Sequence, residues 1–174
     1  MFPCLKVKPR VFSKDKVLFM ADPVNFIIYF SKALNLMTDP ELQFLLEQSR
    51  RNNMAGNVTG MLLYLEGRFL TNIEGRFMQL LEGPEPEVTK IFNSIKQDDR
   101  HDKIILLKQG LLEQRLFDKW SMGFKKIAAG QTGDIPGFFN VDAGFLEQHM
   151  RHEQHEVLNF FRSFYTINNE KPFF

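Results

Sequence analysis

Short apolar runs alternate with amphipathic stretches over residues 26–127, and this order constrains the fold more than any other feature. The apolar runs predict strands at Phe26–Ser31, Gly60–Glu66, Phe77–Glu82, Ile104–Lys108 (with a possible continuation to Gln114) and Trp120–Ile127. Helical patterns follow the first and the third run, so the order is β-α-β-β-α-β-β. We therefore expect an α+β, ferredoxin-like fold with two helices on one face of a five-stranded mixed sheet. The plan hosts many activities and by itself predicts none.

Both helices carry start signals. Thr38 and Glu41 form a capping box, and leucines then recur at helical spacing until Gly56 and Asn57 break the pattern, so this helix should end near Asn53. Pro84 and Pro86 start the second helix, whose apolar stripe consists of Val88, Ile91, Phe92 and Ile95.

Composition divides the chain into three parts. Residues 1–22 hold five basic side chains against two acidic ones and predict a basic N-terminal extension. Residues 23–128 hold the sheet and its two helices. Residues 129–174 predict a glycine- and proline-rich hinge and a C-terminal helical cap, with a helix from Asp142 to about Thr166. This last part is rich in Phe, and the uncovered sheet face is the simplest place for it to pack.

The charge balance excludes several classes of protein. The 174 residues carry 22 Lys and Arg against 21 Asp and Glu, a formal charge of +1, which argues against a nucleic-acid or membrane partner. No apolar run approaches the roughly 20 residues of a membrane span. Cys4 stands alone, so neither a disulfide framework nor a zinc set is available. We expect a soluble cytoplasmic protein.

An internal repeat lies between the second and third strands. The segment LEGRFLTN at residues 65–72 is followed by IEGRFMQL at residues 73–80, and Glu-Gly recurs with a spacing of eight. An even insertion keeps each side chain on its original face, because strands have a period of two. The duplication can therefore lengthen a hairpin without scrambling its core. Thr71 stands in the first copy where Gln79 stands in the second.

No catalytic signature is present, so we do not expect an enzyme. His149, His152 and His155 recur at steps of three within a polar segment, which is more typical of a solvated helix face than of a metal site. His101 ends the segment after the second helix. The residues alone favour a helix cap there, and contact with a ligand is the alternative.

Four polar residues fall where burial is expected: Tyr29, Asn52, Asn53 and Gln79. Buried phenols and amides must be hydrogen-bonded. Each can be satisfied locally. Alternatively, all four converge on one crevice between the helices and the sheet, and such an uncharged, amide-rich pocket would suit a flat heterocycle.

Residues 26–126 resemble the BLUF domain, a flavin-binding blue-light sensor, and the short members of that family. The resemblance rests on IIYFSKA, LLEQSRRNNMAGNVTGMLLY, GRFMQLLEGPEPEV, IKQDDRHDKI and KWSMGF, in family order. It implies a photoactive switch made of Tyr29 and Gln79, with Trp120 and Met122 as mobile positions of the fifth strand. It also implies a flavin site made of Tyr29, Leu45, Asn52, Asn53, Gln79, Ile95, Asp98, Arg100 and His101.

In the family, blue light drives an electron and a proton from the tyrosine through the glutamine to the flavin and back. The resemblance therefore implies a photoreceptor that binds FAD, or FMN or riboflavin in its place. It further implies a protein partner and a homo-oligomer.

Three alternatives remain. If the hairpin used the register that presents Thr71, no amide would be available to switch and the photocycle would be lost. If the insertion had cost the chain its flavin, the chain would be a flavin-less interaction module. A flavin enzyme would need an open second site. RNA binding would need exposed aromatic and basic residues on the central strands.

Overall fold

The computed structural model describes residues 23–69, 72–125, 139–140 and 156–169. Its elements, in chain order, are β1 (Val24–Ala33), α1 (Asp39–Ala55), β2 (Thr59–Phe69), β3 (Asn72–Gly83), α2 (Glu85–Ile95), β4 (His101–Leu112), β5 (Trp120–Lys125), β6 (Phe139–Asn140) and α4 (Glu156–Asn169). The basic extension, the hinge at residues 130–137 and the three histidines of residues 149–155 lie outside the described residues.

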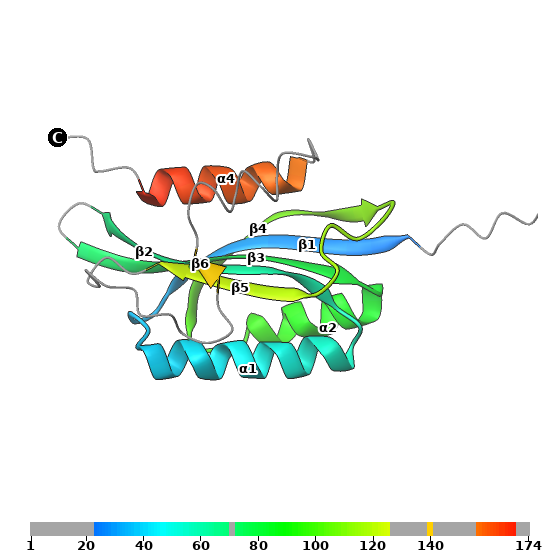
Figure 1. Ribbon diagram of the computed structural model, residues 1–174, viewed down its shortest axis with the longest axis horizontal. Helices are drawn as coiled ribbons and strands as arrows, with labels where there is room; N and C mark the ends of the chain where they lie inside the picture. Colours follow the sequence, from blue (N-terminus) through cyan, green and yellow to red (C-terminus); the bar gives the residue numbers. More distant parts are fainter. Residues whose placement is uncertain (1–22, 70–71, 126–138, 141–155, 170–174) are drawn as a thin grey trace, which may run out of the picture.

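The strands form one mixed sheet in the order β4-β1-β3-β2-β5-β6. The first four pair antiparallel, whereas β5 runs parallel to β2 and β6 runs parallel to β5. The helices α1 and α2 cover one face, and α4 lies across the other (Figure 1). The α+β, ferredoxin-like prediction is confirmed, and β6 adds a short strand that the sequence did not predict.

Two buried clusters occupy the two faces of the sheet. The cluster under α1 and α2 contains Tyr29, Leu62, Phe77, Trp120 and Met122 among its members. The cluster under α4 contains Ile28, Leu63 and Leu80, which alternate along their strands with members of the first cluster, together with Phe161 of α4. The described part of the C-terminal helix thus packs on the sheet face opposite α1 and α2.

Local signals set the ends of α1 as expected. The Thr38 backbone N–H donates to Glu41 Oε2 at 2.7 Å, which satisfies a donor that the helix itself leaves unpaired. At the other end, α1 continues two residues past Asn53, to Ala55, before Gly56 caps it. Of the described helices, none is long and apolar enough to cross a membrane.

The duplication lengthens the β2–β3 hairpin equally on both strands. The ladder continues without a shift from Thr59↔Glu82 to Phe69↔Asn72. Residues 67–76, which the sequence left between two shorter strands, therefore belong mostly to the hairpin. In this register Gln79 lies opposite Tyr29 of β1 and Leu62 of β2. The chain therefore uses the second copy of the repeat, not the first, beside Tyr29.

Candidate functional site

A cavity of about 710 Å³ lies between α1, α2 and the sheet. Its volume is within the usual range of small-molecule sites, about 300–1,000 Å³. Eight of the nine residues predicted to bind a cofactor line it: Leu45, Asn52, Asn53, Gln79, Ile95, Asp98, Arg100 and His101. The ninth, Tyr29, lies directly behind Gln79. The structure thus has the arrangement in which the four polar residues converge on one crevice.

Strand register brings three of the four predicted switch residues, Tyr29, Gln79 and Met122, into one row. Tyr29 of β1 pairs with Gln79 of β3, Gln79 with Leu62 of β2, and Leu62 with Met122 of β5. Cross-strand partners point to the same face of a sheet, so the row lies under α1 and α2. These residues are separated by up to 93 positions in the chain, and only the sheet brings them together.

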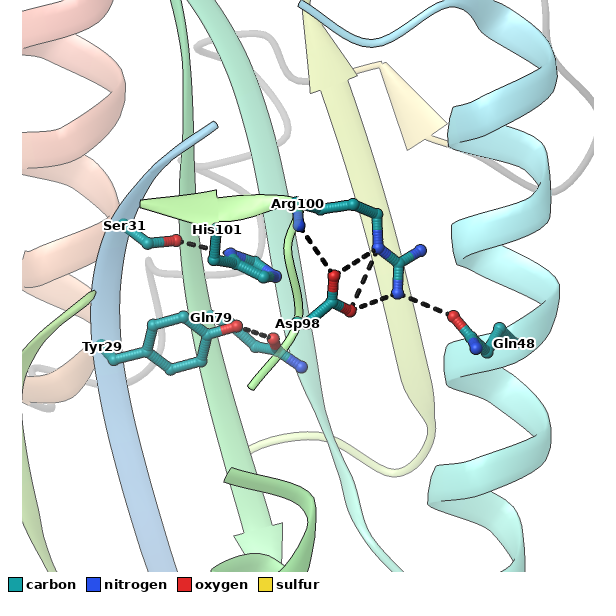
Figure 2. Close-up of polar contacts among 7 residues, drawn as sticks. All are labelled: Tyr29, Ser31, Gln48, Gln79, Asp98, Arg100 and His101. Carbon is teal, nitrogen blue, oxygen red and sulfur yellow. Dashed lines mark hydrogen bonds and ion pairs between the residues drawn. The ribbon is translucent and has the colours of Figure 1, made fainter. Parts of the chain in front are cut away.

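Tyr29 and Gln79 form a buried hydrogen-bonded pair. The Tyr29 hydroxyl donates to Gln79 Oε1 (Figure 2), and the two residues are 0% and 4% exposed. Burial raises the pKa of Tyr29 well above its ordinary value; the charge of Asp98 raises it further and that of Arg100 opposes it. The phenol therefore stays protonated and acts as a donor. This fixes the Gln79 amide with its oxygen toward Tyr29 and its nitrogen directed away (Figure 2).

The α1 wall supplies an amide that has no partner among the described residues. Asn53 is 1% exposed, and its Nδ2 atom has no hydrogen-bond partner. An unsatisfied buried donor costs about 1–3 kcal/mol. Asn53 lines the cavity, so an acceptor on a bound molecule would relieve this cost. Asn52, one residue earlier, also lines the cavity and is exposed.

Aliphatic side chains flank the cavity from the two helices. Leu45 of α1 is 5% exposed and Ile95 of α2 packs against the same buried cluster. Both line the cavity. A flat apolar ring between them would bury surface on both of its faces.

Asp98 and Arg100 form an ion pair at the rim. Arg100 Nε donates to Asp98 Oδ1 at 2.8 Å, and Arg100 Nη2 donates to Gln48 Oε1 of α1, also at 2.8 Å (Figure 2). Burial would raise the pKa of Asp98, but its hydrogen bonds to Arg100 and the Arg100 charge outweigh burial and lower it. The pair stays charged and ties the segment before β4 to α1.

His101 does not cap α2, which corrects the reading that the residues alone favoured. It begins β4, and its Nδ1 atom lies 2.7 Å from the Ser31 hydroxyl of β1. Its ring packs on Phe77, with centroids 4.6 Å apart, and meets the Tyr29 ring edge-on at 6.1 Å. Burial lowers the pKa of His101 to about 4, aided by the charge of Arg100 and opposed by that of Asp98. The imidazole is therefore neutral near pH 7.

Trp120 and Met122 are buried but do not line the cavity. They are 8% and 0% exposed and belong to the cluster under α1 and α2. The Trp120 Nε1 donor is buried without a hydrogen-bond partner among the described residues. On β5, Met122 lies opposite Leu62 and Trp120 opposite Gly60, so β2 separates both residues from Gln79.

Ten further residues line the cavity, among them Gln48 and Leu62, and none of these was predicted as a site residue; nor was Ser31, which contacts His101. Gln48 lies on the same helix face as Leu45 and Asn52, three and four residues away, so helical spacing was a usable signal. Ser31 and Leu62 are brought to the site by the pairing of strands, and no local sequence pattern indicated either residue.

A family model described as sensors of blue-light using FAD matches residues 24–123. This match covers more than half of the chain, including β1, α1, the hairpin, α2, β4 and the start of β5. The chain belongs to the BLUF family. The predicted resemblance and the expected FAD-type cofactor are confirmed at the level of the family.

Two curated proteins illustrate the relatives of this BLUF domain. The blue light- and temperature-regulated antirepressor BluF of Escherichia coli is 30% identical over 126 residues, which are 72% of this chain and 29% of that protein. The photoactivated adenylate cyclase subunit beta of Euglena gracilis is 28% identical over 97 residues, 55% of this chain and 10% of that protein. The chain thus spans less than a third of either relative.

Solved structures agree. The dark-state structure of BlrB, a BLUF protein, matches with a TM-score of 0.50 and 27% identity over 61% of this chain and 74% of that one. Klebsiella pneumoniae BlrP1 matches with a TM-score of 0.61 over 82% of this chain and 34% of that one. At 21% identity, that second likeness shows the fold alone.

The residues present fit a flavin. The isoalloxazine ring is flat and uncharged, with carbonyl and ring-nitrogen edges. The cavity offers it aliphatic walls at Leu45 and Ile95, the unpartnered Asn53 amide and the Gln79 amide.

Proposed function

We propose that this chain is a blue-light photoreceptor in which Tyr29 and Gln79 form the switch. The observation that carries the proposal is the buried Tyr29–Gln79 hydrogen bond at the wall of a cavity of ligand-binding size, whose lining also holds the charged pair Asp98 and Arg100. A hydrogen-bonded phenol and amide can exist in two arrangements of similar energy, and light selects between them.

The flavin, when bound, supplies the absorption of blue light and an acceptor for one electron. Tyr29 would be the residue that gives up an electron, and its hydroxyl proton would move along the hydrogen bond to Gln79 Oε1. With both returned to Tyr29, Gln79 would be left as a changed rotamer or tautomer whose amide donates into the cavity. Such a donor would move the absorption to the red until the resting arrangement returned in the dark.

Asn53 is the donor we assign to the ring carbonyl edge, with Asn52 beside it and Leu45 and Ile95 on the two faces. Asp98, Arg100 and His101 lie toward the tail of the flavin. We propose FAD as the natural cofactor. FMN and riboflavin carry the same ring and would use the same wall residues.

We propose that the output is a changed contact with a protein partner rather than a reaction catalysed by this chain. Trp120 and Met122 carry the change out of the site through β5. The relatives named above include an antirepressor and cyclase subunits, so partners differ between relatives. A homo-oligomer and a cytoplasmic location complete the proposal.

Absorption spectra of the purified chain, in the dark and under blue light, test this function. We expect a yellow protein whose spectrum moves reversibly to the red. A yellow protein without a shift would refute the switch, and a colourless protein that takes up no added flavin would favour the interaction module.

A further inference from the structure

The connection between β4 and β5 runs along one end of the sheet, from the edge strand β4 past three other strands to β5. β4 is the edge strand, and β5 lies beyond β1, β3 and β2 in the order β4-β1-β3-β2-β5. Residues 113–119 must therefore pass the ends of three strands before Trp120 begins β5 opposite Gly60. Without an anchor, this crossover would leave the start of β5 loosely placed.

Glu82 provides that anchor from the end of β3. Its carboxylate accepts hydrogen bonds from the Leu116 backbone N–H at 2.9 Å and the Phe117 backbone N–H at 2.7 Å. It also accepts from the Thr59 hydroxyl of β2 at 2.9 Å. The crossover is thereby tied to two central strands only three residues before Trp120.

Arg115 makes a second set of contacts from the crossover. Its Nη1 donates to Thr59 Oγ1 at 2.7 Å and to the Glu82 carbonyl oxygen at 3.0 Å. Its Nη2 donates to the Asn57 carbonyl oxygen at 2.7 Å. Five hydrogen bonds thus hold residues 115–117 against β2, β3 and the turn before β2.

Glu82 is fully buried, which makes these bonds hard to replace. It is 0% exposed, and burial raises the pKa of its carboxyl, while the surrounding donors and Arg115 oppose the rise. A buried carboxylate is tolerated when its oxygens are hydrogen-bonded, and here both are. Removing one bond would leave a buried polar group unsatisfied.

The other two Glu-Gly copies show that the motif alone does not make this anchor. Glu66 accepts a hydrogen bond from Tyr64, and Glu74 pairs with Lys32. Both of these contacts lie within the sheet, to Tyr64 of β2 and Lys32 of β1. Only the third copy lies at the strand end that the crossover passes.

We propose that Glu82 is a positioning residue of the light response, which couples the strand of Gln79 to β5. Glu82 and Gln79 lie three residues apart on β3, and the contacts of Glu82 hold the chain just before Trp120. Because the crossover is held in place just before β5, a rearrangement at Gln79 is transmitted to β5 and is not lost in movement of the crossover. The inference rests on the switch proposed above.

The test compares the full flavin-loaded chain with Glu82→Gln and, as a matched control, Glu113→Gln. Glu113 belongs to the same crossover but is exposed. A glutamine at position 82 keeps the shape but replaces one acceptor oxygen with a donor, so one backbone N–H loses its partner. Trp120 is the chain's single tryptophan, so its quenching by acrylamide reports on β5 alone.

We expect all three proteins to show the red shift. In the wild type and Glu113→Gln, quenching of Trp120 should change on illumination. In Glu82→Gln that change should fall by at least about half, and dark recovery should alter about two- to thirtyfold, since coupling energies are typically about 0.5–2 kcal/mol.

Two results would overturn the inference. One is a red-shifting wild type in which Trp120 quenching does not respond to light. The other is a Glu82→Gln protein that matches Glu113→Gln in both quenching and recovery. If Glu82→Gln does not fold, Arg115→Gln is tested in its place and judged by the same two measurements. This substitution removes the guanidinium contacts of the crossover and leaves the Glu82 carboxylate intact. A wild type without any red shift would instead refute the switch itself.

Discussion

Two buried tyrosines face α1 and α2 from neighbouring parts of the sheet, but their partners differ. Tyr29 donates to the Gln79 amide, whereas Tyr64 accepts from the Met37 backbone N–H at 3.0 Å and donates to Glu66 Oε1 at 3.2 Å. Burial raises the pKa of both well above the ordinary value. The Tyr29 hydroxyl bonds a residue that lines the cavity, whereas Met37 and Glu66, which the Tyr64 hydroxyl bonds, do not line it, so the pair forms a natural control.

Tyr29→Phe should keep the flavin and lose the red shift. Phe fills the same space but has no hydroxyl to donate to Gln79. Tyr64→Phe, the control, should keep both. Light-minus-dark absorption spectra check this, and a normal shift in Tyr29→Phe would refute the assignment of the switch.

His101 should make stability depend on pH between about 6.5 and 4. Its pKa is about 4 in the folded chain, against 6.5 for an unperturbed histidine. The unfolded chain takes up the proton first as pH falls, so the stabilisation is complete above pH 6.5 and is lost toward pH 4. At about 1.4 kcal/mol per pKa unit, up to roughly 3 kcal/mol is at stake.

Urea unfolding of the wild type and of His101→Asn across this pH range measures the effect. For each protein, the free energy of unfolding is plotted against pH. The difference between the two slopes gives the contribution of His101, because the carboxyl groups contribute to both. Equal slopes would contradict a buried, neutral imidazole.

At the scale of the elements, the lengthened β2–β3 hairpin contains two copies of the repeat, and two deletions can show which copy serves the site. Deleting residues 66–73 leaves Gln79 opposite Tyr29, with Glu74-Gly75 as a two-residue turn. Deleting residues 73–80 removes Gln79 and puts Thr71 in its place. Both variants lose eight residues and keep the strand period. At the site they differ by Gln79 against Thr71, and under α4 by Met78 against Leu70 and Leu80 against Asn72.

We expect both shortened chains to bind flavin and only the variant lacking residues 66–73 to shift to the red. Flavin content and light-minus-dark spectra are the measurements. A shift in the variant that carries Thr71 would show that no amide is needed at this position.

These elements also show how far local patterns reach. The capping residues of α1, the two helices and the order of the strands follow from short-range signals, and the sequence placed them nearly correctly. The ends of the hairpin strands were missed, because Glu-Gly at residues 66–67 and 74–75 reads locally as a turn. Pairing with the opposite strand overrides that preference.

For the molecule as a whole, the sheet supports two cores that can be tested separately. Phe161 of α4 is 0% exposed and belongs to the cluster on the side away from the cavity. Phe161→Ala should lower the free energy of unfolding by about 3–5 kcal/mol. The control, Ile167→Ala on the same helix, alters a side chain that is 64% exposed and should cost less than about 0.5 kcal/mol.

Urea unfolding of the two variants gives these values. A small effect of Phe161→Ala would mean that α4 is not held on the sheet as described. Flavin bound by the folded fraction of Phe161→Ala should still shift to the red, since the switch lies on the other face.

The amino-acid sequence was sufficient for the order of the elements, the helix start signals and eight of the residues that line the cavity. Those depend on periodicity, capping and a recognisable family pattern, all of which are local properties of the chain. Tertiary structure decided which polar groups meet: Tyr29 with Gln79, Ser31 with His101, Arg100 with Gln48 and Glu82 with residues 116–117. These partners lie between 34 and 70 positions apart. Their contacts depend on strand register and on the packing of helices on the sheet, which are set only when distant segments bury their apolar faces together.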